Sequence, residues 1–182
     1  DIEGMSFSET AMHFRERFSL NDSPEQIMAD WNRMALETYS TRVPLKPGAA
    51  QFLKQLKEEG YLLGIATSNS GELARAALRA NRVEDYFDCV RTACEVKTGK
   101  PAPDIYLSVA GTFGVSPREC LVFEDVPMGI LAGKHAGMTV CAVEDAFSLL
   151  RKEEIISMAD HYITDYRDIS EKSVDNRSFR VV

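Results

Sequence analysis

Leu121 to Gly137 reads LVFEDVPMGILAGKHAG, and this stretch is the most informative part of the 182-residue chain. It begins with a short apolar run, typical of a buried strand, which ends in the adjacent acids Glu124 and Asp125. A Pro-Met-Gly turn follows and opens a helix of small residues. Ligand sites of α/β folds form at the carboxyl ends of strands. Carboxylate oxygens there suit Mg²⁺; the alternative is a plain strand end and helix cap, where Asp is also common.

The chain around this stretch alternates strand and helix. Short apolar runs predict strands at 61–67, 87–92, 121–125, 139–143 and 161–164. Helical spacing and end signals such as Gly60 predict helices over 49–59, 71–80, 103–113, 129–136 and 147–158. Strands joined by helices favour right-handed βαβ units. We therefore predict an α/β fold with a mainly parallel sheet flanked by helices.

The first forty or so residues differ, because they show only helical spacing. Ser8 is the expected cap of a first helix, and Ser23 followed by Pro24 marks the start of a second. The segment VPLKPG at 43–48 breaks this pattern and indicates a linker or turn. We expect a small helical domain over 1–44 and an α/β domain over 45–182, with no clear pattern in 174–182.

The composition is that of an ordinary globular protein, with 45% apolar residues and a formal net charge of -7. This acidic balance argues against a nucleic-acid partner. No apolar stretch is long enough to span a membrane, and the start does not resemble a signal peptide. The four cysteines form no Cys-x-x-Cys pair, so we interpret them as buried free thiols of a reducing compartment and not as a zinc site. We expect a cytoplasmic protein without a membrane partner.

A loop of small polar residues follows the strand predicted over 61–67. Thr67, Ser68 and Asn69 stand there, just before a helix start. Hydroxyl donors, free backbone N–H groups and the helix dipole together suit a phosphate group. Helix capping explains these residue types equally well when they are taken alone.

A second loop carries a lysine next to residues that stiffen the backbone. In Lys100-Pro101-Ala102-Pro103 the prolines restrict the chain, so Lys100 projects from a rigid base. Its ammonium group can neutralise a phosphoryl oxygen or a neighbouring carboxylate. A solvated surface lysine is the alternative, because that is where most lysines lie.

The order of these features is specific: a hydroxyl loop, a Lys-Pro-x-Pro-Asp segment, then a Glu-Asp pair with a glycine-rich tail. It resembles the haloacid dehalogenase-like superfamily, in the branch of β-phosphoglucomutase-like phosphatases with a small helical cap. The segments GKPAPDIY and FEDVPMGI are the most specific parts, and the resemblance covers residues 4 to about 168.

The resemblance implies a Rossmann-like core, a partial helical cap over 1–44 and Mg²⁺-dependent phosphoryl transfer. It also implies roles for individual residues: phosphate binding by Thr67, Ser68, Asn69 and Lys100, catalysis by Thr67 and Lys100, and metal binding by Glu124 and Asp125.

The family's first motif, a strand ending in Asp-x-Asp-x-Thr, does not occur in this sequence. Asp1-Ile2-Glu3-Gly4 does not match it, because no apolar strand precedes these residues. By the resemblance, the first Asp of that motif attacks phosphorus. We therefore expect a chain recorded without its first strand, with two unpaired strand edges where a central strand belongs.

Together these features predict a Mg²⁺-dependent phosphatase that acts on a small phosphorylated metabolite, such as a sugar phosphate. The first alternative is a phosphomutase of the same fold. Where β-phosphoglucomutase has an arginine that grips a second phosphate, this chain has Phe7, which cannot supply a guanidinium contact. The second alternative is a catalytically inactive module that binds phosphate or a protein. The absent first motif favours it, whereas the joint presence of Thr67, Lys100 and the acid pair argues against it.

Overall fold

The computed structural model describes residues 2–169 and 180–181 and shows parallel strands connected by helices. The strands are β1 (Gly64–Thr67), β2 (Cys89–Thr92), β3 (Cys120–Glu124), β4 (Thr139–Val143), β5 (His161–Ile163) and β6 (Arg180–Val181). The α-helices are α1 (Phe7–Phe18), α2 (Pro24–Thr41), α3 (Ala49–Glu58), α4 (Gly71–Ala80), α5 (Asp104–Phe113), α6 (Pro127–His135) and α7 (Lys152–Met158). Short 3₁₀ turns are η1 (Glu84–Tyr86), η2 (Ala93–Glu95), η3 (Pro117–Glu119), η4 (Leu149–Arg151) and η5 (Tyr166–Asp168).

The predicted α/β class with a mainly parallel sheet is confirmed. Several element boundaries differ from the expected ones; β1, for example, begins at Gly64 and not at residue 61. Two of the differences have a clear local reason. Helix α1 is capped by Ser6 instead of Ser8, because Ser6 and Glu9 form a reciprocal capping box. The helix expected from Phe147 begins only at α7, because the Asp145 carboxylate accepts a hydrogen bond from the Phe147 backbone at 2.9 Å and stabilises a turn. Of the patternless segment 174–182, only residues 180 and 181 are described.

The strands form two parallel sheets. Strand β1 pairs with β2 from Gly64 opposite Cys89 to Thr67 opposite Thr92. The other sheet has the order β5-β4-β3-β6, and β6 pairs only with the first two residues of β3. Within residues 2–169 and 180–181, one edge of β1 and the carboxyl half of one edge of β3 therefore lack a ladder partner.

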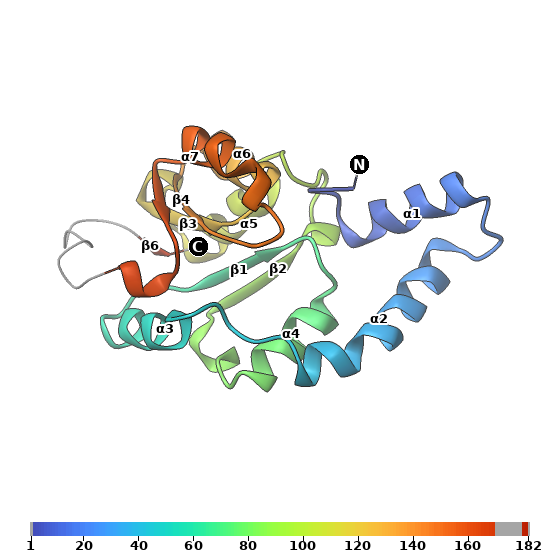
Figure 1. Ribbon diagram of the computed structural model, residues 1–182, viewed down its shortest axis with the longest axis horizontal. Helices are drawn as coiled ribbons and strands as arrows, with labels where there is room; N and C mark the ends of the chain where they lie inside the picture. Colours follow the sequence, from blue (N-terminus) through green and yellow to red (C-terminus); the bar gives the residue numbers. More distant parts are fainter. Residues whose placement is uncertain (1, 170–179, 182) are drawn as a thin grey trace.

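Two hydrophobic clusters hold helices against the strands. The larger lies between α5, α6, α7 and one face of the strands, and its fully buried members include Ile105, Val109, Val122, Ile130 and Val140. On the opposite face, Phe52 of α3 packs against Phe123 and Tyr166 with ring centroids 5.4 Å apart in both pairs. Figure 1 shows β1 and β2 between α5, α6 and α7 on one side and α3 and α4 on the other.

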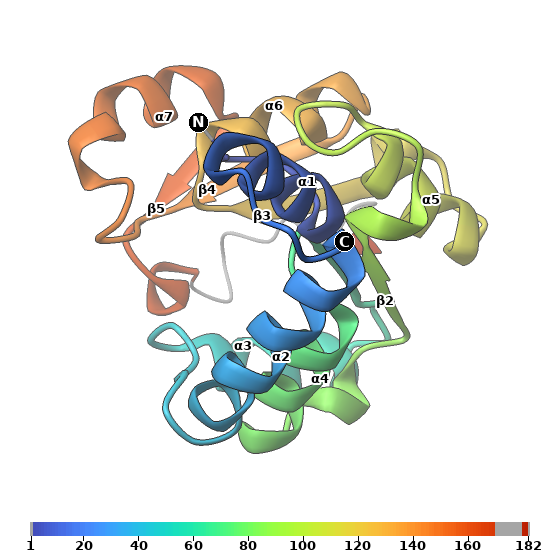
Figure 2. The same ribbon diagram turned by 90° about the vertical axis from the view of Figure 1, so that its right-hand side faces the viewer.

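Helices α1 and α2 form an antiparallel arm that extends from the core and returns to it beside α4 (Figures 1 and 2). Edge-to-face contacts of the Trp31 ring with Phe7 and Phe14, at centroid distances of 5.6 and 5.3 Å, join the two helices. Phe7 is therefore part of the packing inside the arm. None of the helices described is both long and apolar enough to cross a bilayer.

The cysteines are all free in the part of the chain described, but they are not all buried. Cys89, Cys120 and Cys141 are buried, whereas Cys94 is exposed, which corrects the expectation of four buried thiols. Cys94 lies in η2, a surface turn, and not inside an apolar strand. Burial raises the pKa of the Cys120 thiol to about 11 and that of Cys141 to about 12, which keeps these sulfurs protonated and unreactive.

We expect a single thiol of the folded chain to react rapidly with a water-soluble disulfide reagent at pH 8. The reason is that Cys94 alone is exposed among the cysteines. The Cys94→Ser variant should lose the fast phase, and denatured wild-type chain should label at every cysteine. Rapid labelling of a second thiol in the folded state would contradict this burial pattern.

Replacement of Ile130 by Ala should lower the free energy of unfolding by about 2–5 kcal/mol, because Ile130 is fully buried between α6 and the sheet and the smaller side chain leaves a cavity. The matched control is Ile156→Ala on α7, where the side chain is 46% exposed and we expect a change of about 0.5 kcal/mol. Urea denaturation measures both. Equal losses of unfolding free energy in the two variants would contradict the assignment of Ile130 to the hydrophobic core.

Candidate active site

A cleft of about 450 Å³ opens at the carboxyl ends of β1 and β3. It draws side chains from both sheets, from the linker before α3 and from the start of the chain. The lining residues are Glu3, Gly4, Lys46, Ala66, Thr67, Ser68, Lys100, Phe123, Glu124, Asp125, Val126, Val143 and Tyr166. This is the sheet edge at which the sequence places the candidate site residues.

A buried ion pair connects the two sheets inside the cleft. The Lys100 ammonium group donates to the Glu124 carboxylate, and the Tyr106 hydroxyl donates to the same carboxylate oxygen. The Lys100 and Glu124 side chains are only 8% and 9% exposed. Lys100 also donates to the carbonyl oxygen of Ala66 at 3.4 Å, so one side chain contacts the ends of both β1 and β3. Burial and the adjacent Glu124 charge raise the pKa of Tyr106 well above its usual value, which keeps this hydroxyl a donor.

Asp125 has a different environment from its neighbour Glu124. It follows β3, lines the cleft, and has one carboxylate oxygen 3.3 Å from the ammonium nitrogen of Lys46. Burial, followed by repulsion from Glu124, raises the pKa of Asp125, while Lys46 acts in the opposite direction. Asp125 is thus the acid of the pair whose carboxylate is open to a ligand in the cleft.

The hydroxyl loop lies opposite these acids, but its members differ. Thr67 and Ser68 line the cleft, and the Thr67 hydroxyl accepts a hydrogen bond from the backbone N–H of Asn69 at 3.1 Å. The Asn69 side chain is outside the lining and donates to the Tyr39 hydroxyl of α2 at 2.9 Å. Asn69 therefore connects the loop to the helical arm, whereas Thr67 and Ser68 face the ligand space.

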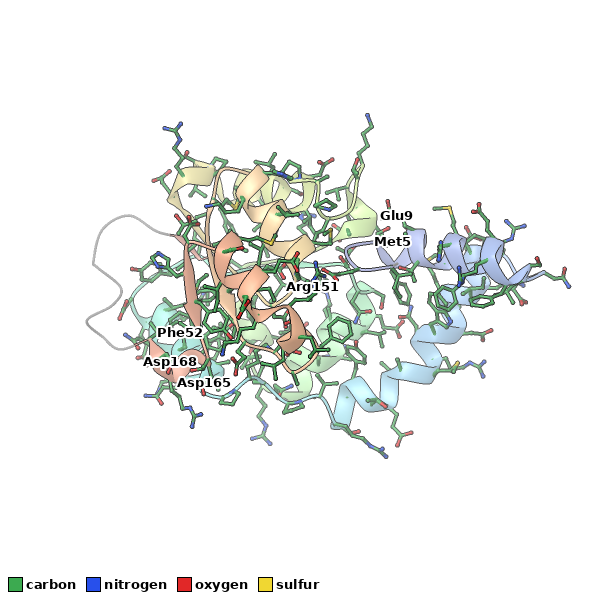
Figure 3. The ribbon with its side chains drawn as sticks, turned by 45° about the horizontal axis from the view of Figure 1, so that its top comes forward. Met5, Glu9, Phe52, Arg151, Asp165 and Asp168 are labelled. Atoms are coloured by element: carbon green, nitrogen blue, oxygen red, sulfur yellow. The ribbon has the colours of Figure 1, made fainter. Side chains whose placement is uncertain are left out.

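The start of the chain closes one side of the cleft. The Glu3 carboxylate accepts from the backbone N–H of Met128 at 3.2 Å and pairs with Arg151 at 2.8 Å. Figure 3 shows Arg151 on the side of the core that faces the segment carrying Met5. Gly4 has a φ of 85°, and a Cβ at this position would lie 2.5 Å from the Lys100 carbonyl oxygen. Only glycine allows this close approach to the lysine loop.

Sequence reasoning missed three residues of this site: Lys46, Glu3 and Tyr106. Lys46 precedes Pro47 just as Lys100 precedes Pro101, so the same Lys-Pro signal was available at both positions. Tyr106 belongs to the quoted GKPAPDIY segment, yet its spacing alone does not indicate a hydrogen bond to Glu124. Glu3 carries no local signal, because its partners lie 125 and 148 residues away in the chain.

The donor set of the cleft fits Mg²⁺ with few protein ligands. The residues described contain no group of three or more His, Cys, Asp or Glu side chains suited to a metal ion. Mg²⁺ usually keeps several waters and takes one or two carboxylates plus phosphate oxygens, so it does not need three or more protein ligands. Asp125 offers the accessible carboxylate, while both Glu124 oxygens already accept hydrogen bonds.

Comparisons with known proteins agree with this architecture. Residues 2–143 match the family model described as haloacid dehalogenase-like hydrolase. The chain is 34% identical over 150 residues to a probable pseudouridine-5'-phosphatase of Drosophila melanogaster, covering 79% of this chain and 64% of the relative. It is 36% identical over 140 residues to hexitol phosphatase A of Escherichia coli, covering 76% of this chain and 64% of the relative. The chain thus spans less than two thirds of the length of these two relatives.

A solved β-phosphoglucomutase structure from Clostridium difficile has the same fold. Its TM-score to this chain is 0.76, at 21% sequence identity, and the match covers 93% of this chain and 75% of the mutase. The shared fold includes the helical arm as well as the α/β core, because the match extends over nearly all of this chain.

Replacement of Gly129 by Ala should destabilise the chain by about 1–3 kcal/mol, because an added Cβ would lie 2.2 Å from the Glu124 carboxyl carbon and would displace the buried ion pair. The matched control is Gly111→Ala on α5, where a Cβ meets no atom within 4 Å and helix propensity should add about 0.5–1 kcal/mol. Thermal unfolding of both variants tests this. Unchanged stability of Gly129→Ala would contradict the close packing of Glu124.

Proposed function

The chain belongs to the haloacid dehalogenase-like hydrolase family, and we propose that the protein is a Mg²⁺-dependent phosphatase of small phosphorylated metabolites. The observation that carries this proposal is the convergence on one cleft of Thr67 at the end of β1, Asp125 after β3, and Lys100 from the loop before α5. Relatives named as pseudouridine-5'-phosphatase and hexitol phosphatase support a substrate of the sugar-phosphate type.

In this proposal the hydroxyl loop and Lys100 bind the phosphoryl group. The Thr67 and Ser68 hydroxyls donate to its oxygens, and the Lys100 ammonium group offsets the negative charge that develops during transfer. Glu124 and Tyr106 hold Lys100 in place through their shared contact. Asn69 keeps the loop in position through its bond to Tyr39.

Asp125, with Glu124 behind it, is the proposed Mg²⁺ position. When bound, Mg²⁺ supplies positive charge beside the phosphoryl oxygens. Asp125 provides a carboxylate oxygen in the cleft, and Glu124 contributes directly or through water. The Glu124 and Asp125 side chains are only 9% and 37% exposed, so solvent screens these charge interactions less than it would at a surface site.

The attacking group in this proposal is a carboxylate carried by a strand between β1 and β3, outside the residues described. The edges of these two strands that lack a ladder partner, and the Lys100 side chain that contacts both, support such a position. A carboxylate oxygen there would bond to phosphorus as the bond to the substrate oxygen breaks. Water would then hydrolyse the acyl phosphate and restore the carboxylate.

Residues 1–44 form the proposed cap domain and 45–182 the proposed core domain. The cap excludes water and selects the substrate. Phe7 packs against Trp31 within the arm, which supports a phosphatase over a mutase that needs a cation for a second phosphate. A cytoplasmic location and the absence of nucleic-acid and membrane partners complete the proposal.

The test is a panel of sugar, polyol and nucleoside monophosphates assayed with the full-length protein, with Mg²⁺ and with EDTA. We expect phosphate release that requires Mg²⁺. The Asp125→Ala variant should lose activity by about 100-fold or more, because the carboxylate nearest the metal position is removed. The control is Asp30→Ala, an exposed acid on α2 that pairs with Arg33.

Two results would contradict the proposal. The first is no hydrolysis of any substrate by the wild-type protein. The second is equal turnover by Asp125→Ala and Asp30→Ala in Mg²⁺, which would show that Asp125 is not a ligand of the metal.

A further inference from the structure

We propose that the Lys46 ammonium group competes with Mg²⁺ for the Asp125 carboxylate and thereby lowers the affinity of this site for the metal. This inference rests on the proposed function, because it assumes that Asp125 is the Mg²⁺ carboxylate. Lys46 lies in the linker between α2 and α3 and lines the cleft. The phosphoryl-transfer scheme proposed above gives this lysine no role.

The Lys46 ammonium group has three acceptors at the carboxyl ends of neighbouring strands. It pairs with the Asp145 carboxylate, donates to the Glu144 carbonyl oxygen at 3.2 Å, and lies 3.3 Å from one Asp125 carboxylate oxygen. An ammonium group has three N–H donors, and two of them bond to Asp145 and Glu144. Lys46 is therefore shared between the end of β3 and the segment after β4.

The base of this lysine is fixed. The carbonyl oxygen of Pro47 accepts a hydrogen bond from the Tyr166 backbone N–H at 3.1 Å. Gly48, with a φ of 79°, packs so closely on Arg167 that an added Cβ would lie 2.8 Å from the Arg167 side chain. The ammonium group is thus held beside Asp125 by the fold. Most surface lysines have no such restraint.

Burial makes the charge of Lys46 effective. The side chains of Lys46, Asp125 and Asp145 are 29%, 37% and 33% exposed, so solvent and salt screen them less than a surface pair. A fixed cation in contact with a carboxylate opposes the arrival of a second cation at the same carboxylate. Asp145 moderates this effect, because it pairs with the same ammonium group and competes with Asp125 for its charge. Lys100, the other lysine of the cleft, pairs with Glu124 instead.

Equilibrium titration of the full chain with MgCl₂, followed by calorimetry, tests the inference without reference to turnover. Lys46→Met should bind Mg²⁺ about tenfold more tightly than wild type, because the competing cation is gone. Lys46→Arg keeps the charge and should restore an affinity near that of wild type. The matched control is Lys57→Met, which removes a similarly exposed lysine from its pair with Asp88, away from the cleft, and should change the affinity little.

The Asp145→Asn variant gives an independent test of the same inference. It should weaken Mg²⁺ binding in the wild-type background, because Lys46 then pairs with Asp125 alone. The same change should have a smaller effect in the Lys46→Met background, since Asp145 acts through Lys46. Equal effects in both backgrounds would show that Asp145 acts by its own charge and would overturn this part of the inference.

The outcomes separate this inference from the proposed function. Equal Mg²⁺ affinity of Lys46→Met and Lys57→Met, with Asp125→Ala unable to bind, would overturn the role of Lys46 and leave the proposed function intact. A wild-type chain that binds no Mg²⁺ would overturn both. If Lys46→Met does not fold, Lys46→Gln is measured in its place; failure of both to fold would make Lys46 a structural anchor and overturn the inference.

Discussion

The contact between Lys100 and Glu124 is the interaction on which the site depends. Within the described residues no backbone ladder joins β1 to β3, so the Lys100 side chain, which reaches Ala66 on one strand and Glu124 on the other, connects the two sheets at the cleft. Both charges are buried. Removal of either partner would leave an uncompensated charge, which is far more costly than the loss of an exposed pair. The lysine can face a phosphoryl group because this contact already fixes it.

The two adjacent acids have different environments. Glu124 is the last residue of β3, whereas Asp125 stands in the bend that follows, so their side chains meet different neighbours. Glu124 turns towards Lys100 and Tyr106, where its charge is neutralised and its oxygens are occupied. Asp125 turns to the cleft and Lys46. Glu124 thus holds Lys100 and Tyr106 in place, and Asp125 faces the space for a ligand.

The helical arm joins the core through polar contacts as well as packing. Asn69 and Ser70 of the hydroxyl loop bond to Tyr39 and Asn32 of α2 at 2.9 and 2.5 Å. At the other end of the arm, Glu3 bonds to the start of α6 and pairs with Arg151. The loop proposed to hold phosphate and the arm proposed to select substrate are therefore mechanically connected, which is the arrangement that a cap over an active site requires.

The sequence by itself determined the class of fold, most element positions and the order of the site segments, because these depend on local signals such as periodicity, caps and turns. Thr67, Lys100, Glu124 and Asp125 could be selected for the same reason. The tertiary structure decided what local signals do not encode: the division of the strands into two sheets, the outward position of Asn69, the burial of Tyr106 against Glu124 and the placement of Lys46. Lys46 and Asp125 are 79 positions apart by number, and only the βαβ topology brings such distant residues to one sheet edge.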